Sequence, residues 1–240
     1  MRALALAVFA AGCAATAPPE APRVLVFTKT AGYRHASIES GVAALREVGA
    51  ARGFGVTATE DSLAFSPDGL APYAAVVFLN TTGDVLGPGG EAALRAYVEG
   101  GGGFVGVHAA ADTEAEWPWF GRLVGARFES HPAVQEATLT VADAGHPATR
   151  ALPARWVRTD EWYNFQGQPE AVRVLLRLDE ATYEGGTMGT EHPAAWAHAV
   201  GAGRSVYTAP GHTAETYAEP LFRAHLGGAV CWAARLGCAR

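Results

Sequence analysis

Apolar and polar positions along the first half of the chain follow patterns typical of strands and helices in turn. Residues 23–28 and 75–80 are short, continuous apolar runs, which favour parallel strands covered on both faces. Residues 54–59 alternate as another strand. Between the first two strands, Ser37 is the expected cap of a helix whose apolar positions are Ile38, Val42, Leu45 and Val48. A further helix is expected from Pro88. This alternation predicts an open α/β sheet.

The second half of the chain contains mainly strand patterns. Residues 135–141 alternate between apolar and polar side chains, as a strand with one solvent-facing side does. Further strands are predicted over residues 156–160, 172–178, 194–199 and 204–208, the last two as a hairpin. Helices are expected within residues 114–125 and over 220–236. No internal repeat is present, so residues 23–236 are predicted to form a single domain.

The composition agrees with one globular domain. Apolar residues make up 49% of the 240 residues and charged residues 18%, which is enough apolar material for a sizeable core. The formal net charge of −6 provides no basic surface of the kind that nucleic acids bind. Nucleic acid is therefore excluded as a partner, and the sequence leaves the oligomeric state open.

Residues 1–22 differ from the rest of the chain and are expected to direct export. A positively charged start is followed by a short apolar run and by Cys13 behind three small residues, as in a bacterial lipoprotein signal. We expect a periplasmic protein or a membrane-anchored lipoprotein, with Cys13 as the lipidated residue and a tether after it. Of the other cysteines, Cys231 and Cys238 either form a disulfide or remain free, and neither is expected to be catalytic.

Polar side chains follow three predicted strands at the point where each strand ends. Residues 29–35, 80–84 and 108–112 are these segments. In an open α/β sheet the ligand crevice lies beyond the carboxyl ends of the strands. The three segments are therefore predicted to line one site.

His108 occupies the sharpest of these strand ends. Gly106 and Ala110 flank it, as small residues flank the nucleophile in the strained elbow of many hydrolases. The elbow has no serine or cysteine, which excludes a Ser-His-Asp hydrolase. Asp112 is expected to orient the imidazole. The glycines at 100–103 precede a strand rather than a helix, which excludes a phosphate cradle at a helix N-terminus.

Four other histidines lie in turns or loops and are candidates for the same site: His35, His131, His192 and His212. Each of them has an alternative explanation as a structural residue of its loop. Neither a His-Glu-x-x-His motif nor a cysteine pair at zinc spacing is present, so no cofactor is predicted. A divalent-metal site built from His108, His131, His212 and a carboxylate is kept as an alternative.

Two acids and two aromatic side chains are adjacent at residues 160–163. The aromatic rings of Trp162 and Tyr163 beside the Glu161 carboxylate suit a sugar, whose C–H faces stack on rings and whose hydroxyls need polar partners. Trp117 can add a further stacking surface. The alternative is a capped turn with one buried aromatic residue.

Seven segments together resemble one known family, the trehalose-utilisation ThuA-like domain. They are residues 28–35, 106–113, 117–121, 125–132, 160–163, 186–196 and 203–212, and the resemblance covers residues 23–236. It implies a flavodoxin-like three-layer sandwich with a central, mostly parallel sheet, similar to class I glutamine amidotransferases. His108 stands where those enzymes hold their cysteine, so glutamine hydrolysis is not expected.

The family is associated with trehalose and related disaccharides, in some systems alongside oxidation to a 3-keto sugar. Together with the signal-like residues 1–22, the resemblance therefore implies an exported protein that binds a small carbohydrate and performs acid–base chemistry on a glucoside or 3-keto-glucoside, as a lyase, hydrolase or isomerase. The expected catalytic residues are His108, Asp112 and Glu161. The expected substrate-binding residues are His35, Trp117, His131, Trp162, Tyr163, His192 and His212. The alternatives are a non-catalytic sugar-binding module and a metal-dependent hydrolase.

Overall fold

A mixed sheet with helices on both faces forms the centre of the molecule. The computed structural model describes residues 21–237, and within them the nine strands of this sheet follow the order β2-β1-β3-β4-β11-β10-β9-β6-β7. One end of the sheet consists of parallel strands: β1 (Arg23–Phe27), β2 (Gly55–Thr59), β3 (Tyr73–Leu79), β4 (Gly103–Val107) and β11 (Gly203–Thr208). Since they run in the same direction, their carboxyl ends lie at the same edge.

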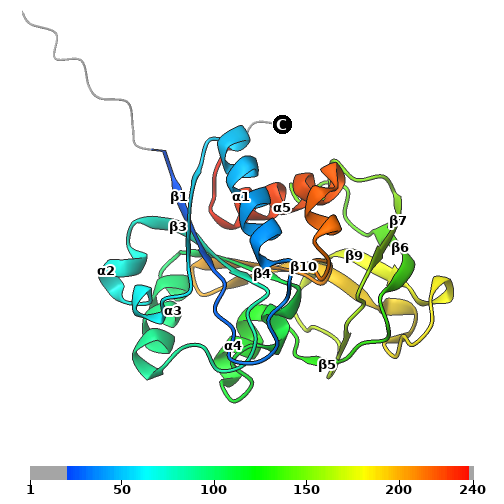
Figure 1. The fold of residues 1–240 in the computed structure, drawn as a ribbon, viewed down its shortest axis with the longest axis horizontal. Helices are drawn as coiled ribbons and strands as arrows, with labels where there is room; N and C mark the ends of the chain where they lie inside the picture. Colours follow the sequence, from blue (N-terminus) through cyan, green and yellow to red (C-terminus); the bar gives the residue numbers. More distant parts are fainter. Residues whose placement is uncertain (1–20, 238–240) are drawn as a thin grey trace, which may run out of the picture.

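Antiparallel strands extend the sheet beyond β11. They are β10 (Pro193–Val200), β9 (Arg173–Asp179), β6 (Gln135–Val141) and β7 (Arg155–Asp160). A separate small ribbon pairs β5 (Phe128–Ser130) with β8 (Asn164–Phe165). Figure 1 shows β6, β7 and β9 at the end of the molecule opposite α2. The chain therefore has the predicted α/β, flavodoxin-like fold, with an antiparallel extension.

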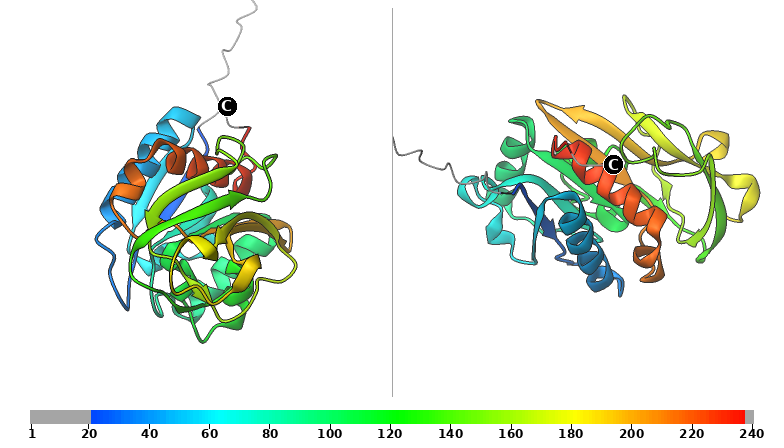
Figure 2. Two further views of the ribbon diagram at one scale, coloured as in Figure 1. Left: turned by 90° about the vertical axis from the view of Figure 1, so that its right-hand side faces the viewer. Right: turned by 90° about the horizontal axis from the view of Figure 1, so that it is seen from above.

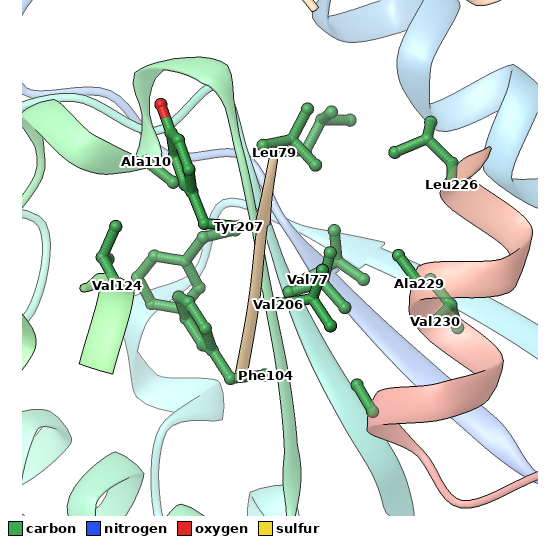
Figure 3. Packing of buried hydrophobic residues seen from close by; sticks show 14 of the residues in the cluster. Val77, Leu79, Phe104, Ala110, Val124, Val206, Tyr207, Leu226, Ala229 and Val230 are labelled. Atoms are coloured by element: carbon green, nitrogen blue, oxygen red, sulfur yellow. The ribbon is translucent and has the colours of Figure 1, made fainter. Parts of the chain in front are cut away.

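Two layers of helices cover the sheet. On one face α1 (Ile38–Arg52) packs beside α5 (Pro220–Ala233), as Figure 2 also shows. The other face is covered by α3 (Pro88–Glu99) and α4 (Pro118–Val124), and the short helix α2 (Pro67–Leu70) packs against α3. In Figure 3, Phe104 and Tyr207 lie on the side of α4, whereas Val77 and Val206 face α5. This alternation about the sheet gives the three layers.

Most predicted elements are present, but the expected cap at Ser37 is wrong. The Ser37 side chain makes no capping hydrogen bond to α1. Its hydroxyl instead donates to the Gly211 carbonyl oxygen at 3.2 Å and accepts from the Asn80 amide at 2.9 Å. Ser37 therefore ties the start of α1 to the loop after β11, which carries a site residue.

Residues 1–20, including Cys13, lie outside the part of the chain that the structure describes, as does Cys238. Cys231 is buried and disulfide-bonded. Among residues 21–237, no helix combines the length and the apolar character needed to span a bilayer.

Gly228 allows α5 to lie directly against the segment before β7. A Cβ atom at this position would collide with the backbone carbonyl of Pro147 and crowd Ala148. We expect Gly228→Ala to lower the free energy of unfolding by about 1–3 kcal/mol, because an overpacked core must shift. The matched control is Gly89→Ala in α3, where a Cβ meets open space. That substitution should raise stability by about 0.5–1 kcal/mol. Urea denaturation measures both, and equal effects would contradict the close approach at α5.

Candidate functional site

Four side chains from four separate segments meet beyond the carboxyl ends of the strands. His35 follows β1, His108 follows β4, His212 follows β11 and Glu161 follows β7. One ligand atom from each of these residues lies within 4.8 Å of those of the other three. We call these four residues the His–Glu cluster. Two of the three predicted segments, residues 29–35 and 108–112, contribute to this cluster, whereas residues 80–84 supply none of its four side chains and Glu161 follows a strand of the antiparallel extension.

His108 sits in the strained turn that the sequence predicts. Its backbone adopts a left-handed φ of 48°, and its side chain is fully buried. The Tyr207 hydroxyl donates to the His108 carbonyl at 2.8 Å, and the Tyr163 ring packs against the imidazole with 4.2 Å between ring centroids. His108 Nδ1 lies 2.7 Å from the Ala209 carbonyl oxygen. Because a carbonyl only accepts, Nδ1 carries the hydrogen and Nε2 faces the cluster.

Glu161 is the centre of the cluster. Its Oε2 atom lies 3.3 Å from His108 Nε2 and 3.1 Å from His212 Nδ1. Its Oε1 atom lies 3.1 Å from Nδ1 of a further histidine, His131. Burial opposes ionisation of Glu161, but the contacts with His108 and His212 outweigh it and hold the Glu161 pKa well below its usual range. Glu161 is therefore a carboxylate at neutral pH.

The remaining two histidines of the cluster have opposite electrostatic environments. Burial, together with the neighbouring imidazoles of His108 and His212, lowers the pKa of His35 to about 3, so that His35 is neutral. The hydrogen bond to Glu161 raises the pKa of His212, although burial acts in the other direction. The His35 ring stands edge-on to His108 and to His212, with 5.0 Å between centroids in each case.

Asp160 fixes the backbone of two cluster residues, Glu161 and His212. Its Oδ1 atom accepts hydrogen bonds from the backbone N–H groups of Glu161 at 2.9 Å and His212 at 3.0 Å. Its Oδ2 atom accepts from Gly211 N–H, the Thr216 hydroxyl and the Arg158 guanidinium, each at 3.0 Å. Since Asp160 is fully buried, all these donors are fixed in one arrangement. This carboxylate therefore sets the distance between Glu161 and His212.

Solvent reaches the cluster on one side. The side chain of His131 is 41% exposed and that of His212 is 23% exposed, whereas Glu161 is 8% exposed. Tyr33 is 66% exposed and packs edge-on against His35 with 4.8 Å between centroids. A ligand would therefore meet His131, His212 and Tyr33 before the buried residues.

Several sequence-predicted site residues have other roles. Asp112 does not orient His108, because the Ala209 carbonyl takes the His108 N–H that such a carboxylate would accept. Asp112 is exposed, and it is one of the charges that raise the Tyr163 pKa, after burial, Tyr207 and Glu161. Tyr163 is also buried, so it supports His108 rather than forming an open sugar platform.

The two tryptophans that were predicted to stack on a sugar also pack against other parts of the protein. Trp162 is fully buried, and its indole N–H donates to the Gln135 carbonyl at 2.9 Å. Trp117 is partly buried and packs on Trp119. His192 is buried between Glu180 and the Tyr163 carbonyl, at 2.8 and 2.9 Å, which makes it a structural residue.

Sequence reasoning missed three contributors. The sequence shows Asp160 only as part of an acidic pair, because its five hydrogen-bond donors come together through tertiary structure. Ala209 contributes through its backbone carbonyl, which the residue type in the sequence does not reveal. Tyr33 lies in a segment already expected near the site, and the aromatic residue type was the available signal, whereas its exposure is seen in the structure.

The residues that could hold a divalent metal differ by one from the predicted set. The alternative named His108, His131, His212 and a carboxylate. The structure brings His35 to the cluster in place of His131, whose contact with the cluster is to the other carboxylate oxygen of Glu161. A second group of acids, Asp84, Glu91 and Glu114, also lies close together, and Glu114 caps the backbone N–H groups of Val85 and Leu86.

A broad hollow of about 920 Å³ lies elsewhere, lined by residues that include Trp119, Arg122, Arg127 and His198. It contains none of the cluster residues. The cluster has the buried, mutually perturbed ionisable groups that mark reactive sites. We therefore take the His–Glu cluster as the candidate site.

Comparisons with known proteins agree with the fold and the resemblance. The family model for ThuA, described as trehalose utilisation, matches residues 23–233. A ThuA-like protein from Bacteroides uniformis is 25% identical with a TM-score of 0.75, over 92% of this chain and 95% of that one. Another from Parabacteroides merdae is 24% identical with a TM-score of 0.71, over 89% and 90%.

More distant structures share the fold alone. A β-galactosidase from Bacillus circulans is 16% identical with a TM-score of 0.59, and the match covers 89% of this chain but 31% of that enzyme. No curated protein sequence matches the chain.

Proposed function

This chain belongs to the ThuA family, described as trehalose utilisation, and we propose that it is an exported enzyme that removes a proton from a 3-keto-glucoside. The proposal is narrower than the family description. It rests on the contact between His131, which lies outside the His–Glu cluster, and the cluster residue Glu161. The export part rests on the signal-like sequence of residues 1–22.

His131 has the geometry of a general base. Its Nδ1 atom lies 3.1 Å from Glu161 Oε1 and 2.9 Å from the Pro132 carbonyl oxygen. Both partners only accept, so Nδ1 carries the hydrogen and Nε2 keeps its lone pair. The carboxylate fixes this tautomer and stabilises the imidazolium that forms when Nε2 takes a proton, which is the role of the acid in a catalytic triad.

The assignment of the base thus moves from His108 or Glu161 to His131. His108 is fully buried and its Nε2 atom faces Glu161. Glu161 is almost fully buried and holds its charge against three imidazoles, so it is a weak base. His131 is the exposed member of the group, and a base must come within hydrogen-bond reach of the proton that it removes.

The reaction follows from the acidity of a C–H bond next to a ketone. His131 Nε2 takes the proton from C2 of the 3-keto-glucoside, and the electron pair of that bond forms an enolate on the C3 oxygen. The enolate then re-forms the ketone and expels the C1 substituent, breaking the C1–O bond. The leaving oxygen receives the proton from His131. The products are an unsaturated keto sugar and the released sugar or alcohol, with no oxidant or water consumed.

Tyr33 and His212 are suited to hold the sugar. Tyr33 offers an exposed ring beside His35, and sugars present apolar C–H faces to such rings. His212 is partly exposed, and its Nδ1 atom faces Glu161, which leaves Nε2 as the ring nitrogen that can reach a sugar hydroxyl. The aromatic platform thus moves from the tryptophans to Tyr33.

Mass spectrometry of a substrate panel tests the proposal. The enzyme should consume 3-keto-glucosides and leave the corresponding glucosides unchanged, and the first-formed products should together have the mass of the substrate. Products that together carry the mass of one added water would indicate a hydrolase instead. Binding of a disaccharide in calorimetry without any product would indicate a non-catalytic module.

A further inference from the structure

Three of the four cluster atoms form a nearly equilateral triangle. Glu161 Oε2, His108 Nε2 and His212 Nδ1 are separated by 3.3, 3.1 and 3.3 Å. Ligands at about 2.0–2.1 Å from a tetrahedral metal ion lie about 3.3–3.4 Å from one another. The spacing of these atoms therefore matches one face of a tetrahedral coordination shell, and a ring nitrogen of His35 lies within 4.8 Å of all three atoms.

The tautomer of His108 is the second observation. With its Nδ1 hydrogen given to Ala209, neutral His108 points the lone pair of Nε2 at a carboxylate oxygen. A proton on Nε2 or a metal cation between the two atoms makes this contact favourable. Protonating both His108 and His212 would place two positive rings against each other, because their facing nitrogens are 3.3 Å apart. A single divalent cation satisfies all three contacts at once.

His35 provides the third observation. Its side chain is 3% exposed, and its Nδ1 atom has no hydrogen-bond partner among the described residues. An unsatisfied buried nitrogen costs free energy. The ring nevertheless stays against His108 and His212.

Hydrogen bonds from the surrounding residues orient the side chains of the cluster, as they do for the ligands of known metal sites. Histidine ligands usually donate their other ring N–H to a carbonyl or carboxylate, as His108 does to Ala209. Asp160 fixes the backbones of Glu161 and His212 through two hydrogen bonds. The other oxygen of Glu161 remains free to orient His131.

From these contacts we infer that His35, His108, Glu161 and His212 bind one divalent first-row transition-metal ion, with zinc as the reference ion. Three imidazoles and one carboxylate favour such an ion over magnesium or calcium, which prefer sites made of oxygen ligands. The inference concerns the cluster of the proposed function but does not depend on the sugar chemistry. If both hold, the ion would be held by four side chains and would act by fixing Glu161, the carboxylate that orients His131.

Metal binding is measured on the full chain produced without a histidine tag. After dialysis against a chelator, calorimetric titration with zinc chloride should give one ion per chain, confirmed by elemental analysis. Loss of a residue that hydrogen-bonds to a metal ligand usually weakens metal binding by about 10–100-fold. Glu161→Gln and His212→Ala remove ligands themselves and should therefore weaken zinc binding by more than this. Cobalt(II) absorption gives a second readout, since the bands of the bound ion should disappear in both variants.

Two histidine variants serve as controls. His198→Ala removes a histidine that contacts the Arg122 carbonyl, outside the cluster, and should bind zinc as the unmodified chain does. His131→Ala should also keep the ion, because His131 is not a ligand. If it keeps the ion and still turns over sugar, the proposed base is wrong and the metal site stands. Failure of the unmodified chain to bind zinc, manganese or iron, or undiminished binding in Glu161→Gln and His212→Ala, would overturn the metal site.

Discussion

His131→Asn is expected to lower kcat/KM for a 3-keto-glucoside by about 10²–10⁴-fold, the usual contribution of a positioned general base. Asparagine keeps a polar side chain of similar reach but has no nitrogen that can accept a proton. The loss should be mainly in kcat, because binding through Tyr33 and His212 is left in place. Steady-state kinetics on the keto-sugar measure it.

The matched control is His198→Asn, a substitution of the same type outside the cluster. It should leave kcat/KM unchanged, since the His198 imidazole hydrogen-bonds to the Arg122 carbonyl oxygen and is not part of the cluster. Equal kinetics for the two variants would contradict the assignment of His131 as the base.

Asp160→Asn is expected to give the largest loss of stability, about 3–5 kcal/mol, the cost of breaking a buried ion pair. An amide cannot accept all the hydrogen bonds that both carboxylate oxygens now receive. It also removes a charge 3.0 Å from Arg158, whose side chain is 1% exposed. Glu219, at 3.2 Å, would be the remaining partner of that guanidinium. Urea denaturation gives the change in the free energy of unfolding.

Glu39→Gln is the corresponding change in an exposed ion pair. Glu39 lies 2.9 Å from Arg34, with side chains 70% and 42% exposed. The expected cost is below about 1 kcal/mol, because solvent screens such pairs. A similar cost for Asp160→Asn would show that the Asp160 network does not hold the loops in place.

The parallel half of the fold could be predicted because its signals are local. Continuous apolar runs such as residues 75–80 mark strands covered on both faces, and the helical spacing after Ser37 marks the crossover between strands. The antiparallel extension was less accessible. Alternation in residues 135–141 indicates a strand, but it does not say which strand lies beside it. The position of β6 between β9 and β7 depends on long-range pairing.

The candidate site was predicted in position better than in detail. His108 and Glu161 were expected at strand ends, and the sheet brings them together. Asp112 was placed beside His108 because it is four residues away. The tight turn over His108–Asp112 leaves the His108 N–H to Ala209 instead. Sequence distance does not reveal a carbonyl 101 residues away.

The aromatic residues show a different limit. Trp162 follows a strand in which buried and exposed residues alternate, but the pattern ends before it, and the chain turns its indole into the core. The adjacent acids and aromatics at residues 160–163 suggested that Trp162 binds the sugar. In the structure Trp162 is buried, and the exposed aromatic ring near the cluster is that of Tyr33. Which aromatic ring faces solvent is a property of tertiary packing.

Hydrogen exchange at C2 of the substrate is the most direct test of proton transfer at the His–Glu cluster. In D₂O, proton NMR of a 3-keto-glucoside with a poor leaving group at C1 would follow the C2–H signal. We expect the unmodified chain to exchange this hydrogen far faster than buffer does, and His131→Asn to exchange it at the buffer rate. Exchange at the buffer rate with the unmodified chain, or undiminished exchange with His131→Asn, would contradict proton abstraction by His131.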